Sequence, residues 1–110
     1  MSSKLLVTII KKGYAKKMIK AGYEVGLKEA LILRGHGTVN PAMFESLMGL
    51  TYDPERDVIL CIVDSDCVFN VKEAFIKTGQ LTRKNTGILL EISMNHALNS
   101  LLSFRGENHE

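Results

Sequence analysis

The sequence predicts a single α+β domain: a four-stranded antiparallel sheet with two helices on one face. Four short apolar runs have the length and β-branched content of buried strands, at residues 4–11, 30–34, 58–63 and 88–92. Two stretches, 13–22 and 65–78, place apolar residues at helical spacing. The order β-α-β-β-α-β is the split βαβ arrangement of ferredoxin-like folds.

The first helix is expected to be amphipathic. Its apolar positions include Met18 and Ile19, its lysines form a solvated face, and Gly22 stands where a helix commonly ends. The second helix has N-cap oxygens at 64–66. The strand at 58–63 is the most apolar stretch of the chain and is therefore expected at the centre of the sheet.

A further short helix is expected at 41–48, inside the long connection between the second and third strands. Asn40 is a good N-cap, Pro41 a good first helical residue and Gly49 a good stop. Apolar residues line one side of it: Met43, Phe44, Leu47 and Met48. This side must pack on its own domain or on a neighbouring subunit.

The end of the chain gives a weaker signal. After Ser93 the leucines at 98, 101 and 102 fit one more turn of helix or an edge segment, and residues 104–110 are expected to form a flexible polar tail. We therefore expect one domain over 1–110, with its core at 4–94. Several strands are apolar at consecutive positions, and a chain of 110 residues has no second layer for the other sheet face, so self-association is expected.

Composition excludes several classes of partner. There are 14 Lys+Arg and 12 Asp+Glu, and a net charge of +2 creates no field that would recruit nucleic acid or an anionic membrane. The first and third strands lack the aromatics that an RNA-recognition sheet uses. No apolar run approaches the ~20 residues of a membrane span, and two cysteines are too few for a disulfide framework. We expect a cytoplasmic protein.

The best candidate for a ligand site is the elbow Arg34-Gly35-His36-Gly37-Thr38, where an apolar strand breaks into charge and exposed backbone. An ordinary strand end is the alternative. The three histidines are too dispersed for a metal site, and no base is placed beside either cysteine. Because His36 also has no visible catalytic partner, we expect neither a metal site nor an enzyme.

Three features of the sequence resemble the PII signal-transduction family of nitrogen-regulatory proteins. They are the order of elements, the elbow Arg34-Gly35-His36-Gly37, and the segment Lys77-Thr78-Gly79-Gln80-Leu81 followed by Gly87-Ile88, and together they cover about 4–94. The resemblance implies a cytoplasmic homotrimer with inward-facing sheets and an adenine-nucleotide site in each cleft between subunits. It also implies a long T-loop, here 37–57, that contacts a target protein such as a transporter, an enzyme or a regulator.

By this resemblance, the cleft residues are Arg34, Gly35, His36, Gly37, Thr38, Thr78, Gly79, Gln80, Arg83, Lys84 and Gly87, and the partner-docking residues are Met43, Phe44, Leu47, Met48 and Tyr52. The effector would be ATP, ADP, AMP or a cyclic nucleotide, held by glycine amides and nearby cations. The alternative is a ligand-free structural or interaction module with the same trimeric fold.

The sequence also departs from the family pattern. The phosphate loop Gly-Asp-Gly-Lys is replaced by residues 82–87, in which Gly87 and a cation from Arg83 or Lys84 are retained. After Gly37 the chain has Thr38-Val39 in place of Arg-Gln, and valine cannot ligate magnesium, so 2-oxoglutarate sensing is not expected. Tyr52 stands in a setting unlike the family's modified tyrosine, so we do not expect that modification.

Overall fold

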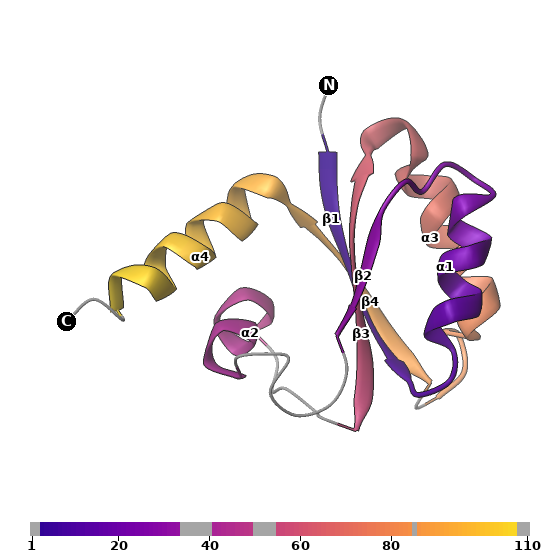
Figure 1. Ribbon diagram of the computed structural model, residues 1–110, viewed down its shortest axis with the longest axis horizontal. Coiled ribbons are helices and arrows are strands. Elements are labelled where there is room, and N and C mark those ends of the chain that lie inside the picture. The colour runs from indigo at the N-terminus through magenta and orange to yellow at the C-terminus, as the bar shows by residue number, and fades with distance from the viewer. Residues whose placement is uncertain (1–2, 34–40, 50–54, 85, 108–110) are drawn as a thin grey trace.

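The computed structural model describes residues 3–33, 41–49, 55–84 and 86–107 (Figure 1). It confirms the predicted order of strands and helices, including the short helix at 41–48, and adds a long terminal helix. The elements are β1 (Ser3–Lys11), α1 (Ala15–Tyr23), β2 (Ala30–Leu33), α2 (Pro41–Met48), β3 (Arg56–Asp64), α3 (Ser65–Gly79), β4 (Gly87–Ser93) and α4 (Met94–Glu107).

The strands form one antiparallel sheet in the order β2-β3-β1-β4. β1 and β3 are central and pair from Ser3 opposite Asp64 to Lys11 opposite Arg56. The most apolar run of the sequence therefore lies in a central strand, as predicted. Among the described residues, β2 and β4 each pair on one side only and form the two edges. The ferredoxin-like α+β class is confirmed.

The main core lies between the sheet and the two helices α1 and α3, which cover one face (Figure 1). Leu6 and Ile10 of β1 meet Met18 of α1 and Phe75 of α3, and all four side chains are fully buried. The helices approach closely because Gly79 has no side chain: a Cβ there would lie 2.8 Å from the Cε of Met18. This face gives the domain its stability.

The opposite sheet face is apolar but only partly covered. Successive side chains of a strand point to opposite faces, so Val7 and Val58 point away from the main core. Phe44 of α2 packs against both of them, which means that the short helix covers its own domain. Elsewhere the same face stays open, with Leu31 56%, Ile62 57% and Ile88 45% exposed. We call this surface the open face.

The terminal helix α4 corrects the prediction for the end of the chain. A single turn or an edge segment was expected after Ser93, with a tail from residue 104, but a 14-residue helix continues to Glu107. Ser93 caps its start, because the Ser93 Oγ accepts a hydrogen bond from the His96 backbone N–H at 3.1 Å. Figure 1 shows α4 projecting away from the sheet next to α2.

Candidate functional site

The loop between α3 and β4 holds the half of the predicted cleft that the structure describes. α3 ends in a Schellman motif: the Leu81 N–H donates to the Ile76 carbonyl at 3.0 Å and the Gln80 N–H to the Lys77 carbonyl at 3.3 Å. Gln80 takes the left-handed conformation that this motif requires, at φ 54°. These bonds fix the direction in which the loop leaves the helix.

Two residues that the sequence did not single out hold this loop in place. The Thr86 hydroxyl lies 2.8 Å from the Gln80 carbonyl oxygen and 3.0 Å from that of Arg83, so its single hydrogen is shared between them. Arg56 of β3 donates from Nη1 to the Thr86 carbonyl at 3.0 Å. No sequence pattern marks this pair, since the two residues are thirty positions apart and meet only across the end of β1.

Some of the predicted cleft residues meet at a hollow of about 420 Å³ beside the end of α3. Gln80 and Arg83 both line it, and the Arg83 Nη1 donates to the Gln80 Oε1 at 3.2 Å. Lys77 adds a second cation and Glu73 one opposing charge. Thr78 is half-buried and Gly79 is buried, and Lys84 and Gly87 do not line the hollow.

Gly87 has a structural explanation of its own. A Cβ at this position would overlap the carbonyl oxygen of Ile9 and would lie 3.0 Å from the Cδ1 of Ile10. β4 pairs with β1 at this point, with Gly87 opposite Ile10. The glycine is therefore needed for the close approach of two strands, whether or not a ligand contacts it.

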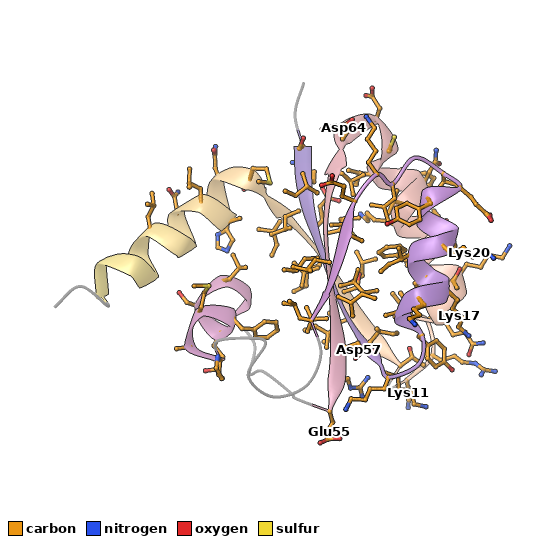
Figure 2. The ribbon with its side chains drawn as sticks, viewed as in Figure 1. Lys11, Lys17, Lys20, Glu55, Asp57 and Asp64 are labelled. Atoms are coloured by element: carbon orange, nitrogen blue, oxygen red, sulfur yellow. The ribbon has the colours of Figure 1, made fainter. Side chains whose placement is uncertain are left out.

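The other half of the predicted cleft, Arg34, Gly35, His36, Gly37 and Thr38, lies outside the described residues, and so does Tyr52. The structure does show where the chain enters that half, because β2 ends at Leu33 opposite Val58. Leu33 and Gly87 lie at the same end of the sheet, where Figure 2 also shows Lys11 and Glu55. They belong to opposite edges, however, with β3 and β1 between them.

The spacing between neighbouring strands gives an approximate distance between the β2 and β4 edges. Neighbouring strands lie about 4.8 Å apart, so the three steps from β2 to β4 separate the two edges by roughly 14 Å. Leu33, which leads into residues 34–38, and the loop at 78–87 are thus at opposite edges of the sheet.

The open face also contains a depression of about 580 Å³ next to β2, which sequence reasoning missed. Its floor and walls are apolar, from Leu5, Leu31, Leu60 and Ile62, and Lys28 and Glu29 lie at its rim. The only sequence signal for it is the apolar run of each strand, which does not reveal which residues the helices leave uncovered.

Three predicted docking residues have side chains that the structure describes, Met43, Phe44 and Leu47, and these three do not form one exposed surface. Phe44 is 7% exposed and packs on the sheet, so it is not available to a partner here. Met43 and Leu47 are half-buried. The Leu47 carbonyl oxygen lies 3.1 Å from the His96 Nε2, a distance at which that ring N–H donates and ties α2 to α4.

The described residues offer little for covalent or metal chemistry. Cys61 is buried in the main core, and desolvation raises the pKa of its thiol to about 12, so it stays protonated and unreactive near neutral pH. Within the described ranges, no group of three or more His, Cys, Asp or Glu side chains could hold a metal ion. No described helix is long and apolar enough to cross a membrane.

Comparisons with known proteins assign the fold. No protein-family model and no curated protein sequence matches the chain. Among solved structures, the chain is similar to Arabidopsis thaliana PII bound to citrate, with a TM-score of 0.60 and 13% identity over 84% of this chain and 78% of that one. It is also similar to the apo form of CPII from Thiomonas intermedia K12, a nitrogen regulatory PII-like protein, with a TM-score of 0.56 and 15% identity over 83% and 87% of the two chains.

These similarities, together with the sheet order, show that the chain has the fold of the PII proteins. The resemblance in its sequence predicted this fold.

Proposed function

We propose that the protein is a trimeric PII-like regulator that binds a small anionic effector in clefts between its subunits. The observation that supports this proposal is that β2, the strand that leads into residues 34–38, and the loop at 78–87 belong to opposite edges of one sheet. A contact between different edges of two copies is heterologous, and such contacts close into a ring when the rotation fits. In a ring of three copies with the open faces turned inward, different edges of neighbouring copies meet and the uncovered apolar surface is buried.

The chemistry of the described half supports an anionic ligand. Arg83 and Lys77 line the hollow beside the loop, and Lys84 adds an exposed cation two residues before Thr86. A ligand with an anionic tail fits these cations, and an adenine nucleotide is our first choice.

Regulation would act through residues 37–57, which connect β2 to β3 and contain α2. The connection between the two strands spans residues 34–55, and long connections usually carry function. We propose that it contacts a target protein in the cytoplasm, and that the protein acts in signal transduction, by analogy with nitrogen regulation, and not as a catalyst. Because Phe44 is buried, an exposed docking role for it would require α2 to leave the sheet.

The test is a binding panel on the unmodified protein. Thermal shift and calorimetry are run with ATP, ADP, AMP, cyclic AMP and citrate, the last because the similar plant protein is bound to it. A site ligand at a hundredfold excess over Kd adds ~2.7 kcal/mol to the free energy of unfolding. Light scattering should give three times the 12.2 kDa chain mass. A trimer that binds none of these ligands would support the ligand-free interaction module instead.

A further inference from the structure

We propose that the terminal helix α4 of each copy packs on the open face of the next copy and covers the apolar depression beside its β2. The contact rests on the trimer proposed above, and it would bring Leu98 of one copy against Leu31 of its neighbour. The occupant of the depression is therefore a second copy of this chain.

One side of α4 is apolar, exposed and uncharged. Met94, Leu98 and Leu102 are all exposed, and their spacing of four residues places them along one side of the helix. The sequence has no Lys, Arg, Asp or Glu between Glu91 and Arg105. A helix that faces solvent normally carries charged residues on its outer side, so this side of α4 has the composition of a buried surface. We call Met94, Leu98 and Leu102 the α4 stripe.

The depression on the open face is an apolar surface of matching size. It crosses three neighbouring strands, β2, β3 and β1, which lie about 4.8 Å apart, so its floor is about 10 Å wide. The α4 stripe covers eight steps of helix, a rise of about 12 Å. A helix laid across the strands would therefore place the whole stripe on the floor, which is formed by Leu5, Leu31, Leu60 and Ile62.

The α4 stripe and the depression do not meet within one chain. α4 follows β4, whereas the depression lies beside β2 at the opposite edge of the sheet. Figure 1 shows α4 running away from the sheet on the side opposite to α1 and α3. The contact of His96 with the Leu47 carbonyl holds α4 in this direction. Leu31 and Leu98 each remain 56% exposed as a result.

The geometry of the proposed ring brings the two surfaces together. With the open faces inward and different edges in contact, the three sheets are the walls of a three-sided prism whose axis runs along the strands. At each corner the β4 edge of one copy meets the β2 edge of the next. A helix that leaves the β4 edge on the open side then runs across the neighbour's open face, starting beside β2. In Figure 1, α4 leaves the sheet in this way, across the direction of the strands.

The register of the sheet places the two surfaces at the same height. Ser93, the last residue of β4, pairs with Lys4. The depression contains Leu5, the next residue of β1, and Ile62, which pairs with Leu5. Rotation about the axis leaves height unchanged, so α4 of one copy is level with the depression of the next. The loop at 78–87 lies at the other end of the sheet, which makes this contact separate from the effector cleft.

The contact is tested by cross-linking between copies. A variant with Leu31→Cys and Leu98→Cys, in a Cys67→Ser background that leaves only the buried Cys61, is treated with a short bismaleimide. We expect covalent pairs and trimers of the 12.2 kDa chain on a denaturing gel. Either new cysteine alone should give neither product. Asn99→Cys in place of Leu98→Cys should lower the yield several-fold, because residue 99 is turned by about 100° on the helix.

A charge variant provides the second arm. Leu98→Glu would place a carboxylate in the apolar depression of the next copy, so the concentration below which the trimer dissociates should rise about tenfold. Asn99→Glu adds the same charge at the neighbouring exposed position and should leave that concentration unchanged. Light scattering over a dilution series measures both variants, and circular dichroism checks that each keeps its helix content.

Three results would overturn the contact while leaving the proposed trimer in place. The first is the absence of cross-links between copies in a protein that light scattering shows to be a trimer. The second is a cross-link within a single chain, because α4 would then fold back on its own sheet. The third is efficient cross-linking of Leu98→Cys alone, which would show that the α4 helices pack on one another. A protein that stays monomeric would overturn both the contact and the trimer.

Discussion

Gly87 of β4 and Ile9 of β1 are in such close contact that a single added carbon on Gly87 would overlap the Ile9 carbonyl oxygen. The Cα of Gly87 and the carbonyl group of Ile9 both belong to the backbone of the sheet, at the point where β4 starts its pairing with β1. The contact separates two roles that the sequence could not distinguish, since a glycine before a strand fits a ligand cradle as well as a tight strand pair. Stability measurements can tell them apart.

We predict that Gly87→Ala lowers the free energy of unfolding by about 2 kcal/mol or more, because backbone must move to accommodate the Cβ. Chemical denaturation measures this loss. Gly13→Ala is the control: Gly13 has φ +97° but nothing within 4 Å of an added Cβ, so its cost is backbone strain alone, about 1 kcal/mol. Equal stability of Gly87→Ala and the unmodified protein would show that the strands are not this close.

Thr8 is a polar residue inside the main core. Its side chain is fully buried, and its Oγ1 has no hydrogen-bond partner among the described residues. A buried hydroxyl without a partner costs free energy, and valine has nearly the same shape. We predict that Thr8→Val raises the free energy of unfolding by about 1 kcal/mol, measured by denaturation. The same change at the exposed Thr82 should have little effect, and destabilisation by Thr8→Val would indicate that the hydroxyl is hydrogen-bonded in solution.

Cys61 should make stability depend on pH in the alkaline range. Burial raises the pKa of its thiol from 9.0 to about 12 in the folded protein, so the unfolded chain loses this proton first. The contribution is complete below pH 9 and is lost as the pH rises from 9 toward 12. Thermal denaturation between pH 8 and pH 11 should therefore show a steeper loss for the unmodified protein than for Cys61→Val. Parallel curves would contradict the raised pKa.

The open face should be an interface between copies. Ile62 is 57% exposed in the single chain, so Ile62→Glu should leave the fold intact and prevent assembly, since the new carboxylate would have to be buried. We expect light scattering to give one chain mass, with an unchanged circular dichroism spectrum. Phe69→Glu is the matched control, because Phe69 is 72% exposed on α3, on the helix side of the sheet. An Ile62→Glu protein that keeps the mass of the unmodified one would place the interface elsewhere.

Much of the fold follows from local sequence patterns. The uninterrupted apolar run at 58–63 predicts a central strand, and β3 is central because it pairs with β1 on one edge and with β2 on the other. Pro41 and Gly49 mark the ends of α2. α4 was underestimated because its asparagines and serines are weak helix formers, although Ser93, placed three residues before His96, was a usable capping signal.

The candidate site was less predictable for a physical reason. Sequence spacing indicates that 34–38 and 78–87 both follow ends of regular elements, but it does not give the order of strands in the sheet. That order puts Leu33, which leads into 34–38, and the loop at 78–87 at opposite edges. The contact of Arg56 with Thr86 and the depression beside Leu31 likewise depend on which elements become neighbours. The residue types of a shared site can be recognised in the sequence, whereas the spatial arrangement that brings them together cannot.

The central claim, that each cleft is built from two copies, is tested most directly by ATP calorimetry on mixed assemblies. One variant carries Arg34→Ala and the other Arg83→Ala with Lys84→Ala, so each homotrimer has one defective half in every cleft and should bind ATP weakly. After unfolding and refolding as an equal mixture, random assembly pairs two intact halves in about a quarter of the clefts, and these should bind ATP as the unmodified protein does. Mixed trimers that recover no such binding, or an unmodified protein that binds no ATP at all, would contradict the account.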